Sequence, residues 1–187
     1  MNAHALPSAG KYKLRVDDYL LLDGTGVFKG EKTELIDGDI IVMSSEWVPH
    51  MRIKDEIAYR LRRLIEEERL GLFVGTSGSV ALSDTDCPQP DVIVAEPFTS
   101  EMAVPREAVR LFVEVSASTF SFDLKEKAER YALAGIPEYW VVDVSGRLIH
   151  QMWAPAEVTY AERREVPFEQ SIIAATLDGL AVETTAL

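Results

Sequence analysis

The sequence predicts an α/β protein of the α+β type, in which helices flank a mixed β-sheet and β extensions follow it. Three observations predict this class. Residues 111–144 show a strand–helix–strand pattern, residues 49–70 show a long amphipathic helical pattern, and short β-prone segments lie on either side of the central unit. Elements that alternate in this way pack as layers around one hydrophobic core.

The strand–helix–strand unit is the centre of the chain. Residues 111–115 read LFVEV, an apolar run typical of a buried strand. A helix is expected over residues 122–134, because Gly135 ends it and Pro137 prevents its resumption. Residues 138–144 indicate a second buried strand. A unit of this length predicts a right-handed crossover between two parallel strands.

The other elements follow from local patterns. Asp37-Gly38 between two β-prone runs predicts a hairpin of residues 33–36 and 39–43. In the long helix, Pro49 suits the first turn and Gly71 marks the end. The remaining expectations are a short helix over 16–22 and strands over 72–74, 79–82, 92–95, 148–153, 157–160 and near 172.

Length and composition limit the class of protein. The 187 residues suffice for one domain, and we expect a flexible tail at 1–15 followed by a single domain at 16–187. No apolar run has the length of a membrane span and the first residues lack a signal-peptide pattern, so no membrane partner is expected. Cys87 is the only cysteine, which excludes an intrachain disulfide and a cysteine-based metal site. These features predict a cytoplasmic protein.

The net charge of −12 bears on nucleic-acid binding. Contact with phosphates requires Lys and Arg, and a strongly acidic chain lacks the field for loose, non-specific binding. Basic residues cluster only locally, at residues 60–63 and 163–164. The excess of acidic over basic residues is compatible with a nuclease cleft that holds a metal ion. It argues against tight binding of DNA in the absence of a metal ion.

Two charged residues occupy positions that are expected to be buried. Glu114 lies inside the apolar strand, where a carboxylate needs a hydrogen-bonding partner, a cation or a metal. On the following helix Lys127 falls within the apolar stripe, whereas Lys125 points to the far side. The stripe consists of Leu124, Ala128, Tyr131 and Ala134. A structural Glu–Lys pair and a functional site both explain this pattern, and the sequence leaves the choice open.

Asp91 is a candidate partner for Glu114, because it opens the neighbouring strand at 92–95. Two carboxylates from adjacent strands can share a divalent cation such as Mg²⁺ or Mn²⁺. A nearby lysine can position a metal-bound water or stabilise developing negative charge. By pattern alone, Glu34 is an exposed strand charge and His50 is a capping or packing residue at the start of the long helix.

Several motifs carry a family resemblance. They are ELIDGDIIVMS from Glu34, His50 with its helix, QPDV at 89–92, EVS at 114–116, Asp123 with Lys127 and Tyr131, and AGIPEYWVVD at 134–143. Together they cover roughly residues 17–153, and the sequence resembles the Uma-two family of predicted restriction endonucleases, within the PD-(D/E)XK nuclease superfamily. The resemblance implies a restriction-endonuclease-like core.

The resemblance also implies roles for individual residues. Asp91 matches the metal-binding aspartate, Glu114 the second acidic ligand, and Glu34 a glutamate that completes the metal site. Ser116 stands where the superfamily has its usual lysine, and Lys127 takes over that lysine's position from the next helix. The implied activity is Mg²⁺- or Mn²⁺-dependent hydrolysis of DNA phosphodiester bonds by Asp91, Glu114 and Lys127.

Two alternatives stay open at this point. The first is the endonuclease, and the second is a non-catalytic protein that keeps the nuclease fold for binding or regulation. A homodimer is also expected, because exposed edge strands need covering and enzymes that cut duplex DNA often use two active sites.

Overall fold

The structure is a computed structural model that describes residues 10–117, 119–185 and 187. Most of the predicted tail, residues 1–9, lies outside the described residues. In the described part of that tail, Lys13 forms ion pairs with Asp37 and Asp39 at 3.1 and 2.8 Å, and the Leu14 N–H donates to the Gly38 carbonyl at 3.0 Å. The chain therefore contacts the hairpin before the first helix begins.

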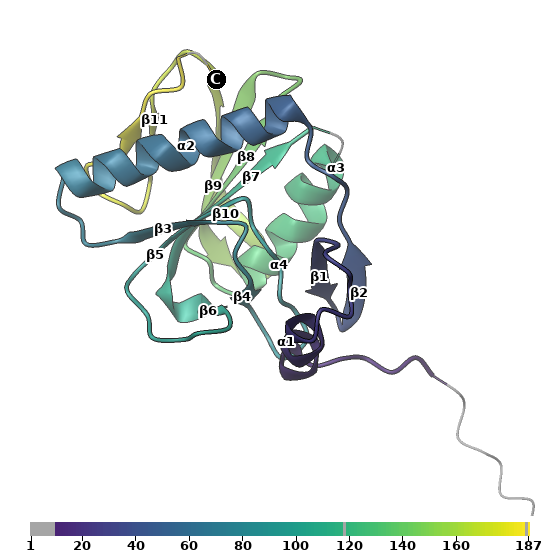
Figure 1. The fold of residues 1–187 in the computed structure, drawn as a ribbon. Helices are drawn as coiled ribbons and strands as arrows, with labels where there is room; N and C mark the ends of the chain where they lie inside the picture. The colour runs from purple at the N-terminus through teal and green to yellow at the C-terminus, as the bar shows by residue number, and fades with distance from the viewer. Residues whose placement is uncertain (1–9, 118, 186) are drawn as a thin grey trace, which may run out of the picture.

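A six-stranded mixed sheet forms the centre of the molecule, as predicted (Figure 1). Its order is β10 (Thr159–Pro167), β9 (Leu148–Ala156), β8 (Glu138–Asp143), β7 (Val109–Ser116), β5 (Val92–Ala95) and β3 (Phe73–Thr76). β7 and β8 are parallel, as the strand–helix–strand unit predicts, and the other neighbours are antiparallel. The central strands β5, β7 and β8 are almost entirely buried, which explains their continuous apolar runs.

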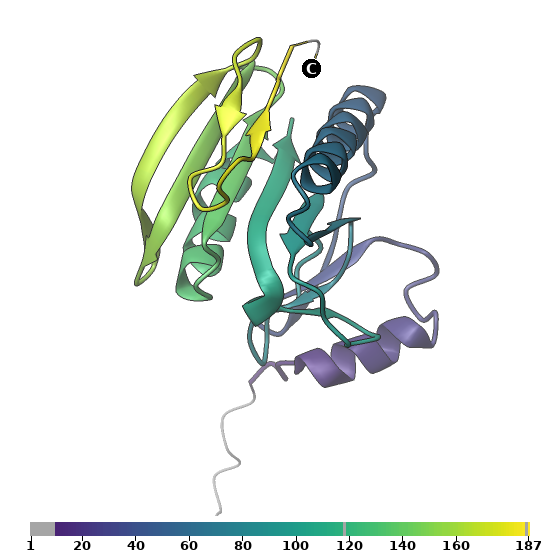
Figure 2. The same cartoon turned by 90° about the vertical axis from the view of Figure 1, so that its left-hand side faces the viewer.

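Helix α2 (Val48–Glu67) covers one face of the sheet (Figure 2). Its buried positions recur every four residues along one stripe, at Ile53, Ile57, Leu61 and Ile65. These side chains pack with Val92, Val113 and Val115 from the sheet. The helix ends at Glu67, three residues before the predicted end, because Arg69 takes a positive φ of 54°.

The helix between β7 and β8 covers the opposite face and is not a regular α-helix. It consists of α3 (Phe120–Phe122), a π-helical segment η2 (Asp123–Lys127) and α4 (Ala128–Leu133). Gly135 with φ of 75° ends it, as predicted. The regular helix expected over 122–134 is therefore corrected to one that widens for a single turn.

A small N-terminal unit packs beside the sheet. It contains α1 (Val16–Gly24), β1 (Thr33–Ile36) and β2 (Asp39–Val42), with a small core around Tyr19, Leu35 and Cys87. Asp37 and Gly38 have φ of 48° and 70°, the geometry that the Asp-Gly hairpin signal predicts. Leu35 and Cys87 exchange two backbone hydrogen bonds of 2.8 and 3.2 Å, which join β1 to the segment that leads into β5.

Short elements complete the fold. β4 (Val80–Ala81) pairs with β6 (Val104–Pro105), which precedes η1 (Arg106–Ala108). β11 (Ile172–Ile173) pairs with β12 (Ala181–Val182) and adds to the core on the α2 side. The predicted C-terminal β extension is thus confirmed. Among the described residues, no helix combines the length and apolarity that crossing a membrane requires.

Candidate metal and active site

Asp91 and Glu114 lie opposite each other on neighbouring strands. β5 and β7 pair Val92 with Val113, so the same register places Asp91 across from Glu114. The Val115 N–H donates to Asp91 Oδ2 at 2.8 Å and fixes that carboxylate at the start of β5. Both acidic residues are about 4% exposed. The two carboxylates therefore belong to the wall of one pocket below the protein surface.

Lys127 reaches this layer from the π-helical segment. Its Nζ lies 2.9 Å from Glu114 Oε1, 3.3 Å from Glu34 Oε1 and 3.9 Å from Asp123 Oδ1. Lys127 is buried whereas Lys125 is exposed, as the helical stripe predicts. The Tyr131 hydroxyl, one turn further on, donates to Glu114 Oε1 at 2.8 Å.

Glu34 is deeply buried, so its interpretation as an exposed strand charge is wrong. Its Oε1 accepts the Gln89 N–H at 3.1 Å in addition to Lys127. The hydrogen bonds between Leu35 and Cys87 press β1 against the chain before β5, and this contact buries the side chain. Within the described residues, Glu34 Oε2 is buried and lacks a hydrogen-bonding partner.

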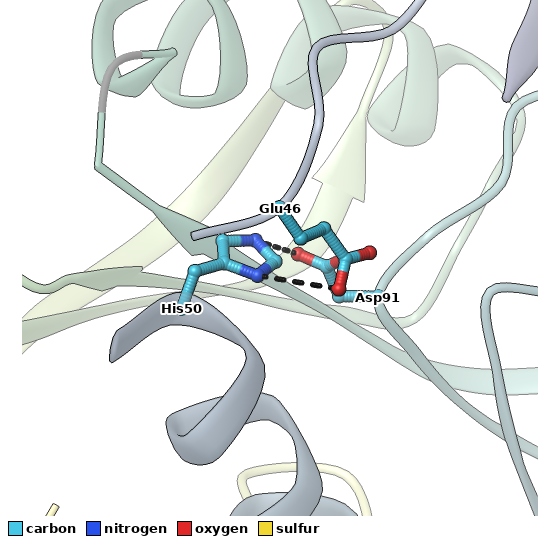
Figure 3. Close-up of side chains that lie close together, drawn as sticks. All are labelled: Glu46, His50 and Asp91. Carbon is cyan, nitrogen blue, oxygen red and sulfur yellow. Dashed lines mark ion pairs between the residues drawn. The ribbon is translucent and has the colours of Figure 1, made fainter. Parts of the chain in front are cut away.

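His50 is not a simple capping or packing residue, which corrects the interpretation from the sequence pattern. Its Nε2 lies 3.1 Å from Asp91 Oδ2, and its Nδ1 lies 3.8 Å from Glu46 Oε2 (Figure 3). Glu46, which the sequence did not single out, precedes α2 by two residues and lies four residues before His50. That spacing of an acid and a histidine at a helix start was the available signal.

Glu46, His50 and Asp91 form the one group of three in the described part of the chain whose ligating atoms all lie within 4.8 Å of one another. The predicted ligands Glu114 and Glu34 are not part of this group, and both form ion pairs with Lys127. Two further lysines neutralise Glu46: Lys54 Nζ lies 2.5 Å from Oε2 and Lys32 Nζ lies 3.6 Å from Oε1. Asp91 thus links two groups of charged side chains.

The carboxylates around Lys127 outnumber its single positive charge. Burial raises the pKa of Glu114 to about 8. The charge of Lys127 opposes this rise, and the charges of the neighbouring carboxylates add to it. Burial also raises the pKa of Asp123 above its usual value. For Lys127, burial lowers the pKa, but the charges of Glu114, Glu34 and Asp123 outweigh it and raise the pKa. Lys127 is therefore a cation among acids that compete for it.

Asp91 and His50 favour their charged forms. Burial raises the pKa of Asp91, but the hydrogen bond and charge of His50, with the Val115 N–H, lower it overall. Burial lowers the pKa of His50, but the hydrogen bond to Asp91 and the charges of Asp91 and Glu46 raise it overall. Each group therefore favours the charged form of the other.

A pocket of about 80 Å³ opens onto these side chains. Its walls include Glu34, Glu46, His50, Asp91 and Glu114. Four carboxylates and an imidazole provide the hard oxygen donors and the nitrogen donor that divalent cations use. The unpartnered Glu34 Oε2 and the excess of negative charge over Lys127 both fit a bound cation.

The comparisons with known proteins bear on the family and the fold. The family model described as "Uma2: Putative restriction endonuclease" matches residues 16–185. The chain belongs to this family. A crystal structure of "a putative nuclease belonging to DUF820" from Anabaena variabilis is similar over 81% of this chain and 87% of that one, with a TM-score of 0.59 and 14% identity. At that identity the likeness shows the fold, a restriction-endonuclease-like mixed sheet with flanking helices. The search of curated proteins found no significant match.

Proposed function

We propose that this member of the Uma2 family is a metal-dependent endonuclease that hydrolyses DNA phosphodiester bonds. The observation that carries the proposal is the facing pair Asp91 and Glu114, with Lys127 2.9 Å from Glu114, in a pocket of a restriction-endonuclease-like sheet. Paired carboxylates and a cation at this distance are the groups that phosphodiester hydrolysis requires.

Asp91, Glu114 and Glu34 are the proposed ligands of Mg²⁺ or Mn²⁺. A bound divalent cation polarises a phosphoryl oxygen and lowers the pKa of a coordinated water. Glu46 and His50, whose ligating atoms lie within 4.8 Å of that of Asp91, can extend the ligand set. Because imidazole suits transition metals better than Mg²⁺, use of His50 would favour Mn²⁺.

Lys127 is assigned as a charge-stabilising residue and not as a base. The surrounding carboxylates raise its pKa, so it keeps its proton at neutral pH. An ammonium held at the wall of the pocket can stabilise the negative charge that develops on a phosphoryl group. Glu114 and Tyr131 hold Lys127 in place through their shared contact at Glu114 Oε1.

A non-catalytic nuclease-fold protein is the second candidate. The observation that favours it is the nearly complete burial of Lys127, whose charge is already paired with Glu34 and Glu114. In that case the network would serve to fix the packing of the helix, β1 and β7.

Isothermal titration with Mn²⁺ and Mg²⁺, together with cleavage of supercoiled plasmid DNA and of circular single-stranded DNA, separates the two candidates. We expect one or more cations to bind, cleavage of at least one of the two DNAs to require them, and Asp91→Ala to abolish both binding and cleavage. Asp84→Ala, which removes an exposed loop carboxylate, is the control and should change neither. Cation binding by the parent protein without cleavage of either DNA would favour the non-catalytic candidate.

The homodimer is likewise a proposal. The edge strands of the central sheet are β3, with four residues, and β10, whose middle carries Glu162, Arg163, Arg164 and Glu165. Short or charged edges already discourage pairing with another sheet, so they supply little support for a dimer. Sedimentation at micromolar concentration tests it, and a monomer alone would contradict it.

A further inference from the structure

Trp47 stands at the mouth of the candidate pocket. It immediately follows Glu46 in the chain and belongs to the pocket wall together with Asp91, Glu114 and Lys127. Trp47 is 79% exposed, so most of a large aromatic residue is open to solvent. Met51, one helical turn later, is also exposed and extends the apolar surface.

The charges around the pocket argue against a contact made through many phosphates. The lysines of the pocket wall are already paired: Lys127 with Glu34 and Glu114, and Lys32 with Glu46 and Asp91 at 3.6 and 3.9 Å. The chain carries a net charge of −12. Duplex DNA binds mainly through neutralisation of its phosphates, which this surface supports poorly.

The depth of the reactive groups also bears on the form of the substrate. Asp91 and Glu114 are almost fully buried, and the space in front of them is about 80 Å³. A flexible single strand can bend one phosphate into such a recess, whereas a stiff duplex also has to bring its flanking phosphates against an acidic surface. An exposed aromatic ring beside the recess offers a stacking platform for an unpaired base.

We propose that Trp47 is a substrate-positioning residue that stacks on an unpaired base, and that the site acts on single-stranded DNA. This inference rests on the proposed function and specifies its substrate. Base stacking on an aromatic side chain tolerates all four bases, so no sequence preference is expected from this contact.

Fluorescence anisotropy with a labelled 20-nucleotide strand, free or annealed to its complement, tests the binding. The measurements are made with the full chain in Ca²⁺, which occupies oxygen-ligand sites, and gels check that the DNA stays intact. We expect the single strand to bind at least about tenfold more tightly than the duplex. Trp47→Ala should weaken single-strand binding about tenfold, and Trp47→Phe should recover most of it.

Trp153→Ala is the matched control. Trp153 is a partly exposed tryptophan on β9 whose ring lies 5.5 Å from the Arg164 guanidinium carbon, outside the pocket wall. It should bind like the parent protein. Single-strand binding that Trp47→Ala leaves unchanged, or a preference for the duplex, would overturn the inference.

Two further measurements separate this inference from the proposed function. The first compares cleavage of circular single-stranded DNA with cleavage of supercoiled duplex in Mn²⁺. If both are cut equally and Trp47→Ala changes neither rate, the inference is wrong and the proposed endonuclease function is retained. Binding through Trp47 without cleavage of either DNA supports the stacking role and contradicts the endonuclease. Sedimentation of Trp47→Ala covers the remaining case, since a parent dimer that this variant dissociates would make Trp47 an interface residue and overturn the inference.

Discussion

Lys127 connects three parts of the candidate site, because its ammonium contacts carboxylates from β1, β7 and its own helix. Removing a single partner from a buried ionic group leaves the others uncompensated, which is costly to stability. The same residue is therefore expected to matter for folding and for the proposed chemistry.

We predict that Lys127→Ala lowers Mn²⁺-dependent nicking by on the order of a hundredfold, the usual effect of removing one group that stabilises developing charge. The variant should also lose about 3–5 kcal/mol of stability, so circular dichroism must first identify a temperature at which it is folded. Lys125→Ala, two residues away and exposed, should keep parental nicking and stability. Equal nicking by Lys127→Ala and the parent would contradict the assignment.

The His50–Asp91 pair predicts a pH dependence of stability. The folded state raises the pKa of His50, so this contribution is complete below the unfolded value of about 6.5 and is lost as the pH rises through the folded value. In EDTA, His50→Gln should lower the free energy of unfolding by about 1–2 kcal/mol at pH 5.5 and by less at pH 8.5. Urea unfolding at both pH values measures this.

Asp91→Asn provides the background that checks the cause. Without the Asp91 charge, the loss caused by His50→Gln should be small and nearly independent of pH. A loss of equal size at pH 5.5 and 8.5 in the original background would show that His50 contributes by packing alone.

How far the site could be predicted depends on how local each signal is. Lys127 and Glu114 can be predicted because each is a charged residue within an apolar pattern. Asp91 can be predicted because it opens the strand that neighbours the one with Glu114. The position of Glu46 in the site depends on how the chain before α2 packs against a distant segment. The burial of Glu34 depends in the same way on how β1 packs against the chain near Cys87. The hydrophobic periodicity within a single helix or strand gives no information about such long-range contacts.

At the scale of elements, the π-helical segment aligns three side chains that a regular helix would spread apart. In an α-helix, two side chains four residues apart are separated by one full turn plus about 40°. In the wider π-helix the same four residues make less than one full turn. Asp123 to Lys127 spans the π segment and Lys127 to Tyr131 spans α4, so the two offsets largely cancel. Lys127 and Tyr131 consequently both contact Glu114, and Asp123 lies 3.9 Å from Lys127. The sequence pattern predicts the helix and the buried face but gives no sign of this widened turn.

The β1–β2 turn offers a test of the element that delivers Glu34. A Cβ on Gly38 would lie 2.8 Å from Lys13 Cβ and 3.0 Å from the Leu14 carbonyl oxygen, and φ is +70°. We predict that Gly38→Ala costs about 2–3 kcal/mol, the left-handed backbone contributing about 1–2 kcal/mol of it. Gly26→Ala is the control, because φ is +72° and no atom of the described residues lies within 4 Å of the added Cβ. Equal losses in urea unfolding would exclude a contribution from the contact with residues 13–14.

At the scale of the whole molecule, three hydrophobic clusters share one chain. Two lie on the faces of the central sheet and the third joins α1, β1 and Cys87. If residues 16–187 are a single domain, as the sequence predicts, all three should unfold together.

Two probes that report on different clusters test this. Circular dichroism follows the central sheet and helices, and labelling of the buried Cys87 thiol follows the N-terminal cluster. We predict coincident urea midpoints. Labelling of Cys87 at urea concentrations that leave the dichroism unchanged would indicate that the N-terminal unit opens separately, taking Glu34 away from Lys127.

The contact between Lys127 and Glu34 joins residues that are 93 positions apart. During synthesis, Glu34 and His50 leave the ribosome well before the helix with Lys127 has been made. An incomplete chain therefore presents ligands without the ammonium that the proposed chemistry needs. Under the proposed function, a chain still being synthesised would therefore be inactive until Lys127, about two-thirds of the way along the 187 residues, has been added.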